Sequence, residues 1–143
     1  MYHCHIQFYL IGGHNVIFES IKEMKPFAHF THSFWESDVP ETEMVARADV
    51  LFVNLQGEDV SKMLRILTAH KKKEAELIIL ADREQVVALP EDLSEIEDMW
   101  LRPLSERELR FRMRKWQQNY KLKKDLCQSD QFRDLSINSS PKL

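Results

Sequence analysis

Two nearly unbroken apolar runs constrain the fold of this chain more than any other feature. They are "VLFVNL", Val50 to Leu55, and "ELIILA", Glu76 to Ala81. A strand with one face in water alternates apolar and polar residues, whereas a continuous apolar strand is buried on both faces. Amphipathic helical patterns flank both runs. The sequence therefore predicts a parallel sheet that carries helices on both of its faces.

Strand and helix patterns alternate five times along the chain. Further strands are predicted at 5–11, 27–35 and 98–101, and helices at 14–25, 39–48, 58–73 and 83–89. A last, long helix starts after Ser105, which with Glu108 forms a capping box. The predicted fold is an α/β, flavodoxin-like three-layer sandwich with a five-stranded parallel sheet and an extended C-terminal helix. Functional residues of such sheets gather at the carboxyl ends of the strands.

The bulk properties favour one globular body in a reducing compartment. The chain has 143 residues, and its only cysteines are Cys4 and Cys127, near opposite ends, so no disulfide framework is expected. No apolar run approaches the roughly 20 residues that span a bilayer, and no secretion signal is recognised at the start. We therefore expect a cytoplasmic protein with no membrane contact.

The residues at the predicted strand ends contribute to a resemblance between this chain and a known protein family. They are Gly12 and Gly13 after the first strand, Asn54 after the third, Ala81 after the fourth and Arg102 after the fifth. With the element order, and with "ADVLFVNL" and "MWLRPLSERELRFRM", they make residues 6–115 resemble the receiver domain of two-component response regulators. The resemblance implies a phosphoacceptor site at this edge of the sheet.

At each position of that site the sequence departs from the family pattern. Receivers hold Mg²⁺ with an acidic pair where this chain has Gly12 and Gly13, and they use an aspartate nucleophile where it has Asn54. The family's hydroxyl and lysine are replaced by Ala81 and Arg102. The aromatic switch position falls on Met99, or on Trp100 with a one-residue shift.

The resemblance together with these departures predicts a degenerate receiver that works without phosphorylation, catalysis, metal or cofactor. An unrelated α/β domain remains the alternative interpretation of the fold. A second functional hypothesis keeps phosphorylation but moves it to a displaced acid, for which Asp49, Asp59 and Asp82 are the candidates.

The last helix carries an apolar stripe with a heptad spacing. Leu109, Met113, Trp116 and Tyr120 follow one another at steps of four, three and four residues. Such a stripe buries large side chains against another helix, so we expect a homodimer through it. Two other interpretations are packing of the stripe on its own domain and, because residues 105–127 hold eight Lys or Arg against three Asp or Glu, nucleic-acid binding.

The C-terminal tail indicates a longer signalling protein. "QSDQFRDLSINSSPKL" resembles the opening of a PAS sensory domain. That resemblance implies a downstream PAS domain followed by an output module such as a GGDEF diguanylate cyclase or a histidine kinase. We accordingly expect a body over residues 1–104, a signalling and dimerisation helix over 105–132, and a linker or the start of a PAS-like domain over 133–143.

Overall fold

The structure is a computed structural model that describes residues 4–13, 15–23, 30–57, 59–89 and 94–120. The chain divides into two units, Met1–Leu104 and Ser105–Leu143. The first unit holds the sheet and four helices, and the second holds the last helix.

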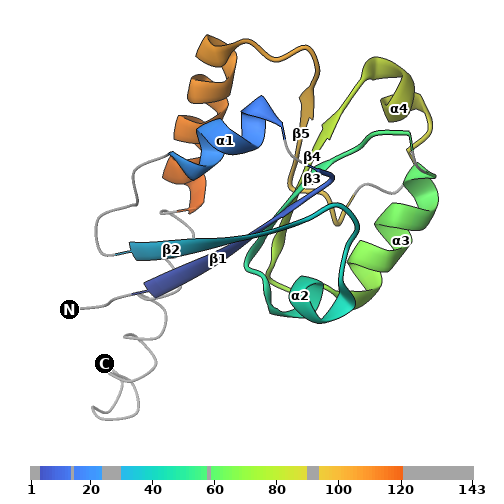
Figure 1. Cartoon of the computed structure of the whole chain (residues 1–143), viewed down its shortest axis with the longest axis horizontal. Helices are drawn as coiled ribbons and strands as arrows, with labels where there is room; N and C mark the ends of the chain where they lie inside the picture. The colour runs from blue at the N-terminus through green and yellow to red at the C-terminus, as the bar shows by residue number, and fades with distance from the viewer. Residues whose placement is uncertain (1–3, 14, 24–29, 58, 90–93, 121–143) are drawn as a thin grey trace, which may run out of the picture. The chain divides into compact units, whose positions relative to one another are not determined.

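Five strands form one parallel sheet in the first unit (Figure 1). They are β1 (Cys4–Ile11), β2 (Phe30–Ser37), β3 (Val50–Asn54), β4 (Glu76–Ala81) and β5 (Asp98–Leu101). Their order is β2-β1-β3-β4-β5, which is the flavodoxin-like order and places the point where the strand order reverses between β1 and β3. The predicted fold class is confirmed, and β4 and β5 have the predicted bounds. The strand predicted at 27–35 is observed from Phe30 and continues to Ser37, while residues 27–29 lie outside the described chain.

Four helices cover the two faces of the sheet. α1 (Val16–Lys22) lies on one face, and α2 (Thr42–Arg47) and α3 (Val60–His70) lie on the other, followed by α4 (Arg83–Val87). Each of three helices begins at a side chain typical of helix starts. Asn15 caps α1 by accepting from Phe18 N at 2.9 Å, Asp59 caps α3 by accepting from Lys62 N at 3.1 Å, and Asp82 forms a capping box with Gln85 at α4.

The end of α3 differs from the prediction for a physical reason. The sequence predicts a helix through residue 73, but α3 ends at His70. The side chain of Lys71 is only 4% exposed and its Nζ lies 3.0 Å from a carboxylate oxygen of Glu95. The same Nζ donates to the backbone oxygens of Lys72 and Ala75 at 3.3 Å. These contacts hold the chain in a turn, so the basic run does not extend the helix.

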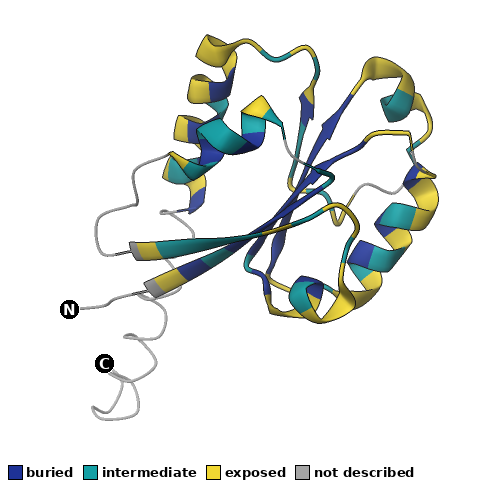
Figure 2. Cartoon of the chain, in the orientation of Figure 1, coloured by how far each residue is buried: buried dark blue, intermediate teal, exposed yellow. Residues whose placement is uncertain are grey.

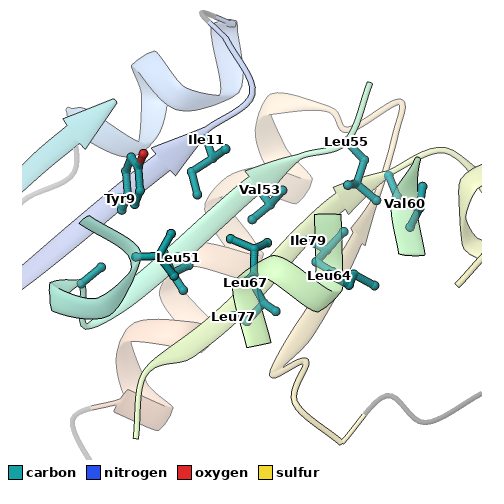
Figure 3. Close-up of a cluster of buried hydrophobic side chains, with 13 residues drawn as sticks. Tyr9, Ile11, Leu51, Val53, Leu55, Val60, Leu64, Leu67, Leu77 and Ile79 are labelled. Atoms are coloured by element: carbon teal, nitrogen blue, oxygen red, sulfur yellow. The ribbon is translucent and has the colours of Figure 1, made fainter. Parts of the chain in front are cut away.

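The main core lies between the sheet and α2 and α3 (Figure 3). Every residue of β3 and β4 is buried, as Figure 2 shows for the centre of the sheet. The prediction that these strands are covered on both faces is thereby confirmed. On the opposite face, aromatic rings form a row across the sheet: Phe34, Phe8, Phe52 and Trp100, with successive centroids 4.9, 6.1 and 5.4 Å apart. Such pairs add about 0.5–1.5 kcal/mol each to the free energy of unfolding beyond their buried area.

The amino edge of the sheet is tied together by one carboxylate. Asp49 accepts a hydrogen bond from Gln7 N at 2.7 Å and forms an ion pair with Lys72 at 2.6 Å. Its backbone oxygen accepts from Glu76 N at 3.0 Å. Asp49 therefore connects β1, the turn after α3 and the start of β4. Both of its carboxylate oxygens take part in these contacts.

The second unit contains a helix over residues 106–120. The hydroxyl of Ser105 accepts from Glu108 N at 3.1 Å, which confirms the predicted N-cap. The stripe residues Leu109, Met113, Trp116 and Tyr120 are buried, each 5% exposed, and buried positions recur along one side of the helix in Figure 2. The predicted continuation to residue 132 and the segment 133–143 lie outside the described chain. In the part of the chain that the structure describes, no helix has the length and apolarity needed to cross a membrane.

His32 gives the stability of the body a predictable pH dependence. Burial lowers the pKa of His32 below its ordinary value of 6.5, and the charge of nearby His5 lowers the pKa further. The ring of His32 lies against Phe8 and Phe34, with centroids 5.8 and 5.0 Å away. The folded state then binds a proton less readily than the unfolded state. The contribution of His32 to the free energy of unfolding is therefore fully present above pH 6.5 and is lost as the pH falls below it.

Urea unfolding between about pH 8 and pH 5 tests this linkage. The free energy of unfolding is expected to fall more steeply with acidification in the wild type than in His32→Gln. His70→Gln, at an exposed position on α3, controls for the substitution itself and should keep the wild-type slope. Equal slopes for the wild type and His32→Gln would contradict the assignment.

Candidate functional site

The carboxyl edge of the sheet brings three of the predicted site residues into contact. Gly12 and Gly13 follow β1, Asn54 ends β3, and Arg102 follows β5. The amide nitrogen of Asn54 donates to the backbone oxygen of Gly12 at 3.3 Å, and the guanidinium of Arg102 donates to the amide oxygen of Asn54. The strand ends that the sequence singles out therefore form one connected polar group.

Arg102 is the centre of this group. Its Nε lies 3.0 Å from Asp82 Oδ1, and one terminal nitrogen donates to Asn54 Oδ1. The other terminal nitrogen donates to the backbone oxygen of Leu55 and, at 2.6 Å, to Gln85 Oε1. We call these five residues the Arg102 cluster. Hydrogen bonds from a charged donor are stronger than those between neutral groups, so the cluster ties β5 to the ends of β3 and β4.

The amide of Asn54 is used at both of its ends. Asn54 is 7% exposed; its oxygen accepts from Arg102 while its nitrogen donates to Gly12. A carboxylate at this position could accept from Arg102 but would turn an acceptor oxygen toward the Gly12 carbonyl. An amide satisfies both neighbours, whereas an ionised aspartate would satisfy only one. This explains the chemistry of residue 54 from its contacts.

Gly12 leaves no room for a side chain. Its φ is +113°, and a Cβ on it would lie 2.3 Å from the backbone oxygen of Asn54. Gly13 also has a positive φ, +82°, a region that residues with side chains rarely adopt. With this backbone, the first position after β1 cannot hold the acidic ligand that receivers place there.

Ala81 and Met99 are not part of the cluster of side chains. Ala81 is fully buried in the core on the α2 and α3 side, and only its backbone oxygen meets the site, where it accepts from Arg102 N at 2.8 Å. Met99 is half-buried, while the next residue, Trp100, is fully buried with its ring on Phe52 and its Nε1 donating to Asp98 at 2.8 Å. Of the two positions considered for the aromatic switch, Trp100 is therefore a core residue.

Two members of the site, Gln56 and Gln85, were not predicted from the sequence, and Asp82 was predicted only as a candidate phosphoacceptor. Asp82 and Gln85 hold Arg102, and the side-chain nitrogen of Gln56 donates to the backbone oxygen of Gly12. The capping box that Asp82 and Gln85 form immediately after β4 could be recognised from the sequence, because it joins residues close together in the chain. Gln56 has no such signal, because its partner lies 44 residues away.

The acids that could replace the missing nucleophile occupy different places. Asp49 lies at the amino edge, at the other end of β3 from Asn54. Asp59 caps α3, and Asp82 pairs with Arg102 although its side chain remains 57% exposed. Within the described ranges, no three His, Cys, Asp or Glu side chains gather in a way that could hold a metal ion.

No family model matches the sequence, and no curated protein or solved structure matches it either. A functional proposal for this chain therefore rests on its fold and on the contacts at the carboxyl edge.

Two glycines test the steric requirement at residue 12. Gly12→Ala is expected to lower the free energy of unfolding by more than about 2 kcal/mol, because its Cβ meets a backbone oxygen and its φ is strained. Gly57→Ala is the matched control, since a Cβ on Gly57 meets nothing within 4 Å; its effect should stay within about 1 kcal/mol. Equal effects in chemical denaturation would contradict the described backbone.

A lysine substitution tests the Arg102 cluster. Arg102→Lys keeps the positive charge but cannot reproduce the planar set of donors, so we expect a loss of about 2 kcal/mol in the free energy of unfolding. Arg83→Lys, at an exposed position of α4, should change it by less than about 0.5 kcal/mol. Urea titrations of the two variants provide the comparison, and an unchanged Arg102→Lys protein would rule out a structural role for the cluster.

Proposed function

We propose that this chain is a receiver-like regulatory module that acts through protein contacts and without phosphorylation. In this proposal the α/β body sets the position of the helix that follows Ser105, and the helix passes that position to a downstream output domain. The observation that supports the proposal most is the Arg102 cluster, because it occupies the carboxyl edge with a cation and two amides.

The chemistry of phosphoryl transfer gives the reason. An aspartyl phosphate needs a carboxylate nucleophile and a divalent cation, and Mg²⁺ is held by hard oxygen ligands. Residue 54 is an amide already bonded to Arg102 and Gly12, and residue 12 has no space for a ligand. The neighbouring cation, Arg102, would also repel Mg²⁺. The edge is therefore better suited to a fixed structural role than to catalysis.

The helix supports the transmission part of the proposal. Its N-cap at Ser105 immediately follows the end of the first unit at Leu104. A continuous helix carries a displacement at one end to the other, which suits a connection to a PAS-like domain and an output module. The expected homodimer through the stripe remains part of the proposal.

A displaced phosphoacceptor is the second candidate function, and Asp82 is the residue that favours it. Asp82 directly follows β4, so it lies at the carboxyl edge, and more than half of its side chain is exposed. Its ion pair with Arg102 opposes phosphorylation in the ground state, because the pair would have to break for the carboxylate to attack.

Intact-mass measurement after incubation with acetyl phosphate and Mg²⁺ separates the two functions. We expect no addition of about 80 Da, the mass of a phosphoryl group, to the wild type or to Asn54→Asp, because restoring the nucleophile does not restore the metal ligands. Addition to the wild type that disappears in Asp82→Asn and after hydroxylamine treatment would establish the second function. Addition to Asn54→Asp alone would show that the edge binds Mg²⁺ after all.

A further inference from the structure

Among the strands that the structure describes, β2 forms one edge of the sheet and pairs only with β1. It is the first strand in the order β2-β1-β3-β4-β5, and its eight residues pair with β1 in an unbroken register from Cys4↔Phe30 to Ile11↔Ser37. Exposed edges in stable proteins are commonly protected by a lysine, a proline or a bulge. The sequence of β2, "FTHSFWES", contains neither residue, and its register contains no bulge.

The orientation of the backbone identifies the residues that face outward. The backbone oxygen of Ser37 accepts from Gly12 N at 3.0 Å, so the backbone groups of Ser37 face β1. Successive residues of a strand direct their N–H and C=O groups to opposite sides. The groups of His32, Phe34 and Glu36 consequently point away from the sheet. No described residue forms a hydrogen bond with the backbone N–H or C=O group of these three residues.

We propose that the β2 edge binds the β2 edge of a second copy of this chain, antiparallel, with the two-fold axis at Phe34. In this register Phe34 faces Phe34 of the second copy, and His32 faces Glu36 of the second copy, twice by symmetry. The Phe34–Phe34 pair and the two His32–Glu36 pairs are each hydrogen-bonded pairs, in which the two facing residues exchange two N–H···O=C bonds. Every outward N–H and C=O of these residues therefore gains a partner. The result is a continuous ten-stranded sheet.

Side-chain complementarity selects this register over its neighbour. Residues directly opposite each other in an antiparallel pair share one face of the sheet. With the axis at Phe34, two aromatic rings meet, and each Glu36 carboxylate, which accepts from Lys22 of its own chain at 2.8 Å, also meets an imidazole that can donate a hydrogen bond to it. With the axis at Ser33, Phe34 would face His32, and the Glu36 carboxylate would not meet an imidazole. A second copy fits because, of these two registers, the one about Phe34 pairs aromatic with aromatic and imidazole with carboxylate.

This inference does not depend on a receiver-like function, since it uses only the geometry of the edge. It also differs from a dimer through the helical stripe, because the two surfaces share no residue. The two kinds of dimer therefore need an experiment that reports which residues face each other.

Disulfide trapping in the 143-residue chain supplies that report. Thr31 faces Ser37 of the second copy as a non-hydrogen-bonded pair, whose Cα atoms lie about 4.5 Å apart, within the range of disulfides. Thr31→Cys and Ser37→Cys are each prepared in a chain with Cys4→Ser and Cys127→Ser, and oxidised with copper phenanthroline alone and as a mixture. We expect a crosslinked dimer in the mixture and none in either protein alone. A mixture without the crosslink, or equal crosslinking of each protein alone, would overturn the proposal.

Sedimentation velocity over a range of micromolar concentrations measures the strength of the contact. Glu36→Lys replaces both symmetric Glu36–His32 pairs and should raise the dissociation constant of the dimer about tenfold. Glu84→Lys, the same change at an exposed position of α4, should leave the dissociation constant unchanged. Circular dichroism confirms that both variants are folded. A wild type that remains monomeric at every concentration, or a dimer equally affected by both changes, would contradict the edge contact.

Discussion

The guanidinium of Arg102 holds the carboxyl edge of this sheet in a single arrangement. It bonds to Asn54, Leu55, Asp82 and Gln85, which belong to the ends of β3 and β4 and to the start of α4. A planar side chain with five donors is suited to joining several acceptors at fixed angles. The amide at residue 54 follows from this arrangement, whereas the glycine at residue 12 follows from its positive φ and from the close approach of the Asn54 backbone oxygen.

The two edges of the sheet are held by comparable means. Asp49 joins β1, Lys72 and the start of β4 at the amino edge, as the Arg102 cluster joins strands at the carboxyl edge. Between these edges, β3 and β4 are buried throughout. Packing of this kind agrees with the proposal that the body acts by contact and position. The open edge of β2 is, in this account, the surface of the body best suited to receive another chain.

The fold was more predictable from the sequence than the site. Burial on both faces leaves unbroken apolar runs, so β3 and β4 and the parallel sheet could be recognised directly. The end of α3 could not, because the contact that ends it joins Lys71 to Glu95, far along the chain. The strand-end positions of Gly12, Asn54 and Arg102 were predictable from topology, since carboxyl ends meet at one edge. The contacts that Arg102 makes with Leu55, Asp82 and Gln85 were not, because the reach of a long side chain has no local pattern in the sequence.

We propose that the Arg102 cluster keeps the carboxyl edge from binding a metal ion and a phosphoryl group. A crystal structure of the protein soaked with magnesium and beryllium fluoride, an analogue of a phosphoryl group, tests this claim most directly. The account predicts neither ligand at the carboxyl edge, with Arg102 still bonded to residues 54, 82 and 85. Magnesium and beryllium fluoride bound beside Asn54, with the arginine displaced, would contradict it.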